Sequence, residues 1–247
     1  MVRTGNPVLN ADTFQSTHSV ASSNGMTVVG TAYKTLFLLA LAVLSAGVTW
    51  PMVMAGDGAN AVTWAMGGAI GGLVFALILR FKMHWAPYLA PAYALCQGLF
   101  LGALSAVFEA RYPGIALQSI AATGGTLVTL LIAYCTRLIK PSQNFRLVLA
   151  AAIGGISIVY LIGFIGSFFK WQIPMIHESG PVGIAFSLFV VVVAALSLVI
   201  DFDYIENAAA AGTSKRMEWY GAFALLVTLV WLYIEMLKLL AKLRRRN

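Results

Sequence analysis

Long, unbroken apolar runs fill almost all of this chain after its first 30 residues. Each run is close to the roughly 20 residues that a helix needs to cross a bilayer. In lipid, only helices and closed barrels satisfy their backbone hydrogen bonds, and continuous rather than alternating apolar runs favour helices. The sequence therefore predicts an all-α fold, a polytopic membrane bundle of seven transmembrane helices.

The predicted spans are separated by short turns and by loops that carry the charged residues. Residues 1–30 are polar and lack the basic start and apolar core of a signal peptide. We expect a flexible polar N-terminal tail over 1–30 and a single membrane domain over 31–247. Within that domain the spans are predicted at Thr35–Met54, Ala61–Leu79, Tyr88–Phe108, Ile115–Thr136, Phe145–Phe169, Val182–Asn207 and Trp219–Leu240.

Charged residues make up 10% of the chain, whereas about 25% is usual in a soluble protein. The net charge of +7 does not indicate nucleic-acid binding. Much of it lies beside the last span, where anionic lipid is the expected partner: Lys238, Lys242, Arg244, Arg245 and Arg246. Cys96 and Cys135 lie within apolar runs, so we expect neither a disulfide nor a metal site.

The Lys and Arg content of the loops indicates an orientation, because cytoplasmic loops carry an excess of both. The loops after the second, fourth and sixth spans hold seven such residues, and the alternate loops hold two. This count favours a cytoplasmic N-terminus and an external C-terminus. The basic C-terminal tail favours the opposite side for the C-terminus, so the two signals disagree there.

The apolar run Val182–Ile200 is followed directly by three acids, Asp201, Asp203 and Glu206. An alanine run and then Gly212 come next, so the helix should continue past the acids and stop at the glycine. An ionisable residue inside the membrane is costly and is by default a functional-site hypothesis. The alternative is that these acids lie in the headgroup zone and face water.

The last two spans should form a hairpin, and its geometry determines which residues of the seventh span lie opposite Asp201. At about 1.5 Å per residue, a turn near Thr213 places Asp201 level with Leu225–Thr228. Glu235 would lie roughly 10 Å further along the axis, which makes a direct pair with Asp201 doubtful. Lys238 follows Glu235 by three residues, so a local ion pair is expected for that glutamate.

Four glycines in the second span, Gly67, Gly68, Gly71 and Gly72, form two small-xxx-small pairs, and Gly98 and Gly102 repeat the spacing. Such pairs let helix backbones approach closely.

Motifs of common enzymes are missing from the sequence: it has no Walker loop, GxSxG, HExxH or paired CxxC. The three histidines are scattered over a tail and two loops: His18, His84 and His177. An aspartyl protease would need a second aspartate from another helix, and the seventh span has none. We expect no enzymatic activity and no cofactor.

Three stretches resemble the Bax inhibitor/YccA family, also called the transmembrane Bax inhibitor motif family. They are Gly98–Glu109 in the third span, Asp201 with Ile205 in the sixth, and Leu232–Leu237 in the seventh. The resemblance covers residues 31 to the end, and the tail residues Asn6–Leu9 look like a bacterial branch of the family. It implies a bacterial inner-membrane protein whose seventh helix is wrapped by the other six.

The resemblance also implies a pH-sensitive calcium leak, in which two aspartates on the sixth and seventh spans share a proton and close the pore. Asp201 matches the first of these, and Thr228 stands where the second is expected. A threonine cannot titrate, so this chain departs from the paired-acid pattern. Bacterial members are also linked to the membrane protease FtsH, which implies an alternative function as a non-conducting substrate or modulator of such a protease.

The sequence thus favours a cation leak with calcium as the permeant ion and Asp201 as its pH sensor. Asp203 and Glu206 are expected to form an acidic cytoplasmic vestibule that concentrates cations. Topology suggests Arg80 as a partner for Asp201 on the cytoplasmic side.

Overall fold

The computed structural model describes residues 25–139, 141–169 and 180–246. Most of the expected tail 1–30 lies outside the described residues, as does the loop that holds His177. The expectations for those segments therefore remain predictions.

The described chain is built from helices, seven of which are long and apolar enough to cross a membrane. This confirms the predicted class of fold, and the predicted spans lie within or close to the observed helices. In chain order these are α2 (Val28–Met54), α3 (Gly58–Phe81), the short 3₁₀ helix η1 (Met83–Trp85), α4 (Ala86–Arg111), α5 (Ile115–Cys135), α6 (Gln143–Phe168), α7 (Pro181–Ala210) and α8 (Met217–Arg246).

Local chemistry explains where several of these helices begin and end. The hydroxyl of Thr27 accepts a 2.9 Å hydrogen bond from the Gly30 amide at the start of α2, and Ser142 caps α6 in the same way. Gly212 follows the end of α7 with φ +68°, a conformation that glycine adopts without strain. As expected, α7 runs through the three acids into the alanine run and ends just before Gly212.

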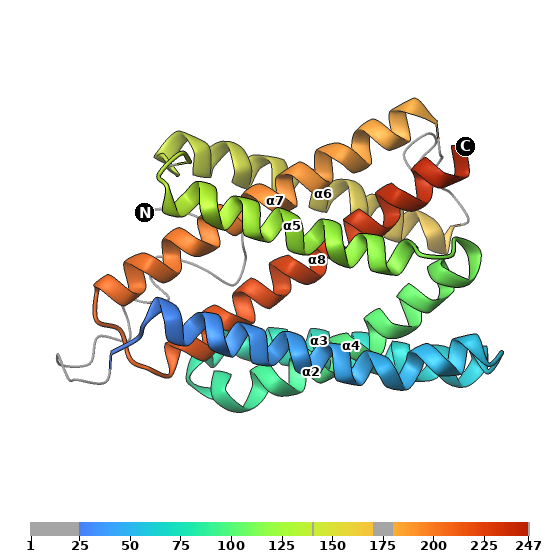
Figure 1. The fold of residues 1–247 in the computed structure, drawn as a ribbon, viewed down its shortest axis with the longest axis horizontal. Coiled ribbons are helices and arrows are strands. Elements are labelled where there is room, and N and C mark those ends of the chain that lie inside the picture. Colours follow the sequence, from blue (N-terminus) through green and yellow to red (C-terminus); the bar gives the residue numbers. More distant parts are fainter. Residues whose placement is uncertain (1–24, 140, 170–179, 247) are drawn as a thin grey trace.

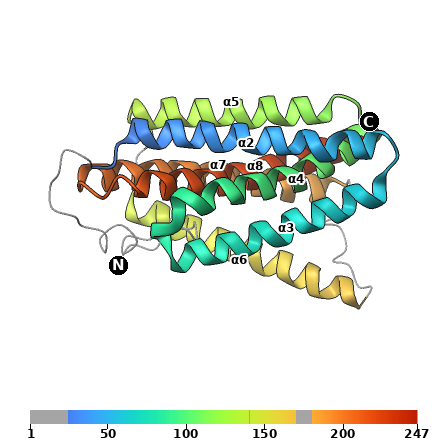
Figure 2. The same ribbon diagram turned by 90° about the horizontal axis from the view of Figure 1, so that it is seen from below.

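The helices form two groups with α8 between them (Figure 1). Helices α2, α3 and α4 pack together on one side, and α5, α6 and α7 lie on the other. Helix α8 packs closely against α2, α4, α5 and α7, while α3 packs on α2 and α4, and α6 packs mainly on α7. The view from below shows α7 and α8 in the middle layer of the bundle (Figure 2). The seventh membrane helix is therefore central, as the family resemblance implied.

Glycines let α2, α3 and α4 approach closely. A Cβ atom at Gly98 would overlap with Ser45 and the Ala42 carbonyl of α2, and one at Gly68 would overlap with the Cys96 carbonyl of α4. Gly67, by contrast, has no neighbour within 4 Å. The packing expected from the small-residue pairs is thus found at Gly68 and Gly98, whereas Gly67 faces away from its neighbours.

Replacing Gly98 by alanine should destabilise the bundle by about 1–3 kcal/mol, because overpacking forces the α2 backbone to move. Gly47 in α2 is a matched control, since nothing lies within 4 Å of a Cβ there. Gly47→Ala should be neutral or stabilising by up to about 1 kcal/mol, because alanine is the better helix former. Unfolding free energies in detergent micelles measure both, and equal effects would contradict the close approach.

The orientation predicted from the loop charges can be tested at the turn between α7 and α8. Ser214 pairs with Gly25 through a backbone bridge, so the exposed Lys215 is the better probe. In a chain with Cys96 and Cys135 replaced by serine, Lys215→Cys should resist an impermeant thiol reagent in intact cells. Asp57→Cys, in the exposed turn at the opposite end, should react readily. The reverse pattern would overturn the orientation.

Candidate functional site

Asp201 is fully buried where α7 packs against α8. The hydroxyl of Thr228 on α8 donates a 2.6 Å hydrogen bond to its carboxylate. This contact confirms the hairpin register that places Thr228 opposite Asp201. The neighbours Leu198 and Ile205 are buried as well, so Asp201 faces the interior of the bundle rather than water.

The Asp201–Thr228 contact links the two most buried membrane helices of the described chain. Burial penalises the charged form of a carboxylate, and a hydrogen bond to the carboxylate favours it. Hydrogen bonds to a charged acceptor are also about twice as strong as neutral ones. Gain or loss of one proton at this position therefore changes the strength of a direct link between α7 and α8.

Asp203 and Glu206, which the sequence predicts to form an acidic cytoplasmic vestibule, each lie beside an arginine. Arg146 at the start of α6 forms an ion pair with Asp203, and both side chains are largely buried. Glu206 accepts a hydrogen bond from the Tyr134 hydroxyl of α5 and lies 3.9 Å from Arg137. Each acid therefore faces an arginine, because neighbouring helices bring basic loop residues to the end of α7.

The pairing of Arg80 with Asp201 stays a prediction, because no salt bridge of the described residues tests it. The charge of Arg80 acts on Tyr220 of α8. Tyr220 precedes Thr228 by eight residues, or about 12 Å along the helix. Helix α3, which carries Arg80 near its end, packs on α2 and α4.

Glu235 lies towards the other end of α8 and is buried. Lys238 donates to it at 3.0 Å, which confirms the expected local ion pair. The Tyr160 hydroxyl of α6 donates to its second carboxylate oxygen at 2.9 Å. These contacts place Glu235 in a separate polar cluster, seven residues or about 10 Å along α8 from Thr228.

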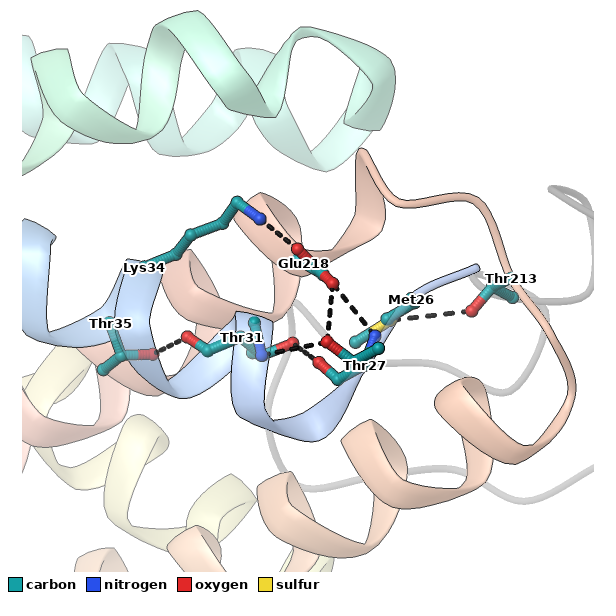
Figure 3. Close-up of polar contacts among 8 residues, drawn as sticks. Met26, Thr27, Thr31, Lys34, Thr35, Thr213 and Glu218 are labelled. Atoms are coloured by element: carbon teal, nitrogen blue, oxygen red, sulfur yellow. Dashed lines mark hydrogen bonds and ion pairs between the residues drawn. The ribbon is translucent and has the colours of Figure 1, made fainter. Parts of the chain in front are cut away.

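Buried Glu218 is the centre of a further polar cluster, which could not be identified from the sequence (Figure 3). Its carboxylate accepts hydrogen bonds from the Thr27 amide at 3.0 Å and from the Thr27 hydroxyl at 2.9 Å. Lys34, two turns further along α2, forms an ion pair with it. The cluster attaches the start of α2 to the start of α8.

Adjacent backbone contacts strengthen this attachment. The Met26 amide donates a 2.7 Å hydrogen bond to the Thr213 carbonyl, and the Thr213 hydroxyl lies 3.5 Å from the Met26 sulfur (Figure 3). Gly30 leaves the space that Glu218 occupies, because a Cβ there would overlap with the carboxylate. The sequence offers one indication of this cluster, namely that Glu218 is an acid in the first turn of α8. Such an acid is already explained by its favourable interaction with the helix dipole, so it did not point to a partner in α2.

Within the ranges that the structure describes, no group of three or more His, Cys, Asp or Glu residues is placed to hold a metal ion. The polar groups that the fold brings together are instead pairs that join one helix to another.

Seven membrane-spanning helices around a buried carboxylate define a multi-pass α-helical membrane protein. A family model described as Bax inhibitor 1 like matches residues 6–245, which is almost the whole chain. The chain therefore belongs to this family, as the three matching stretches indicated. No curated protein is similar enough to the chain to count as a match.

Proposed function

We propose that this protein is a pH-sensitive cation leak, with calcium as the permeant ion, in the inner membrane of a bacterium, and that it is not an enzyme. The observation that carries the proposal is the fully buried Asp201, hydrogen-bonded to Thr228 between the two central helices. Buried ionisable groups inside membrane bundles are characteristic of ion pathways and proton relays.

The contact supplies a switch with one carboxylate rather than two. When Asp201 is charged, the hydrogen bond from Thr228 is charge-assisted and holds α7 against α8. When Asp201 takes up a proton, the bond weakens and the two helices can separate more easily. Acidification therefore favours the conducting state.

The two arginine pairs at the end of α7 have a secondary role in this proposal. Arg146 with Asp203, and Arg137 with Glu206, connect α7 to neighbouring helices close to Asp201. They hold the end of α7 while the contact with Thr228 changes. Asp203 and Glu206 thus support the switch as positioning residues rather than by concentrating cations.

Calcium flux into liposomes that contain the full chain tests the proposal. The flux should exceed that of protein-free liposomes and should rise as the pH is lowered from about 8 to about 5. A flux equal to that of protein-free liposomes at every pH would exclude conduction. That result would favour the alternative of a non-conducting protein that is a substrate or modulator of a membrane protease such as FtsH.

A further inference from the structure

A cavity of about 660 Å³ lies towards the C-terminal end of α8, far along the helix from Thr228. Residues of α4, α6, α7 and α8 line it. Its volume is within the range of small-molecule sites, about 300–1,000 Å³. The Asp201 switch described above does not involve this cavity.

Basic side chains dominate the polar lining of the cavity. The lining has one carboxylate, that of Glu235, and four basic side chains from α4 and α8: Arg111, Lys238, Lys242 and Arg245. Glu235 forms its ion pair with Lys238. The cavity therefore has an excess of positive charge, which suits an anionic ligand.

The four cations are held to different degrees. Lys242 donates to the Gly183 carbonyl at 3.0 Å and to the Ser187 hydroxyl at 2.8 Å, which fixes it to the start of α7. Arg111 and Arg245, in contrast, have no acidic partner among residues 25–139, 141–169 and 180–246. Their guanidinium groups are suited to bidentate contact with a phosphate.

The rest of the lining is apolar. Val107 of α4 and Phe164 of α6 line the cavity and are 57% and 63% exposed, so this wall continues onto the outer surface of the bundle. Lipid chains cover that surface in a membrane. A small inorganic anion would use the basic residues and leave the apolar wall without a partner, whereas an amphiphile contacts both.

We propose that this cavity binds one acidic phospholipid. Its phosphate lies between Arg111 and Arg245, and one acyl chain lies along Val107 and Phe164. The neighbouring Arg244 does not take part, because it donates to the Pro113 carbonyl at 2.6 Å and to Gln118 at 3.0 Å, holding the turn between α4 and α5. Within the basic tail, the proposal thus assigns Arg245 to lipid binding and Arg244 to the turn between α4 and α5.

Native mass spectrometry of the full chain in detergent micelles, titrated with dioleoylphosphatidylglycerol or dioleoylphosphatidylcholine, tests the proposal. The parent should bind one phosphatidylglycerol more tightly than phosphatidylcholine. Each basic residue contributes about fivefold to the attraction of an anionic lipid, so the double variant R111Q/R245Q should bind phosphatidylglycerol on the order of thirtyfold more weakly. The control pair K215Q/R216Q, exposed at the opposite end of the bundle, should bind like the parent.

A second variant separates the cavity from general charge attraction. Val107→Trp keeps every charge and fills the apolar part of the site, so it should also weaken the binding of phosphatidylglycerol. This variant decides the question even if R111Q/R245Q does not fold. The proposal is wrong if phosphatidylglycerol has no advantage over phosphatidylcholine, if the control pair loses as much affinity, or if Val107→Trp binds like the parent. Inorganic phosphate that competes as well as the lipid would identify a small-anion site and would equally contradict the proposal.

Discussion

Liposomes that contain the Asp201→Asn variant should conduct calcium with a flux that no longer depends on pH between about 5 and 8. Asparagine has nearly the shape of aspartate and can still accept the hydrogen bond from Thr228, but it cannot gain or lose a proton. The amide resembles the protonated carboxyl group in its lack of charge. The variant should therefore conduct at every pH at close to the level that the parent reaches at low pH.

Thr228→Val is the matched variant on the opposite helix. Valine keeps the shape of threonine and removes the hydroxyl that donates to Asp201. The flux should still depend on pH, because Asp201 still titrates. The midpoint of the curve should move to higher pH, because the charged carboxylate has lost a stabilising donor.

The ratio of flux at pH 5 to flux at pH 8 provides the readout, and in Asp201→Asn it should fall to about one. An Asp201→Asn variant that keeps the pH profile of the parent would show that another group senses the proton. A flux that disappears at all pH values in this variant would show that Asp201 is required for permeation rather than for gating.

The membrane helices and two side-chain contacts could be predicted from the sequence because they depend on local rules. A continuous apolar run specifies a span, and the constant rise of a helix specifies which residues meet across a two-helix hairpin. These rules placed Thr228 opposite Asp201 and paired Glu235 with Lys238. Both contacts join residues whose spacing is fixed by a single helix or by one short turn.

Contacts between helices that are distant in the chain could not be predicted in this way. The partners of Asp203 and Glu206 come from the ends of α5 and α6, and nothing in the spacing of those residues shows that they meet α7. Arg80 was assigned to Asp201 from topology alone, and the packing of α3 on α2 and α4 does not follow from the spacing of its residues either. Gly67 and Gly68 show the same limit, because the spacing alone does not tell which face of a helix is covered.

Glu218 is the clearest example of a residue whose contacts could not be predicted from spacing. Its partners Thr27 and Lys34 (Figure 3) are separated from it in sequence by almost the whole length of the domain. The Glu218→Ala variant should lose about 3–5 kcal/mol of unfolding free energy. Its side chain is 2% exposed and that of Lys34 is 19% exposed, so truncation leaves a charge that water reaches poorly. It also leaves the Thr27 amide at the start of α2 without its acceptor.

Replacing both charged residues by neutral ones should recover most of the unfolding free energy that Glu218→Ala loses. In the double variant E218Q/K34M, the amide oxygen can still accept from Thr27, and no unpaired charge is left in the cluster. We expect it to lie within about 1 kcal/mol of the parent, and therefore to be more stable than Glu218→Ala. Equal losses in the two variants would show that the ion pair itself, rather than the cost of an unpaired charge, stabilises the junction.

Glu206→Ala is the control on the preceding helix, because Glu206 also faces a basic residue but does so at the surface. The side chains of Glu206 and Arg137 are 49% and 73% exposed, and their charged atoms are 3.9 Å apart. Exposed pairs contribute about 0–1 kcal/mol, so this variant should unfold close to the parent in the same detergent. If Glu206→Ala costs as much as Glu218→Ala, burial is not what makes the Glu218 cluster strong, and the attachment of α2 to α8 has another origin.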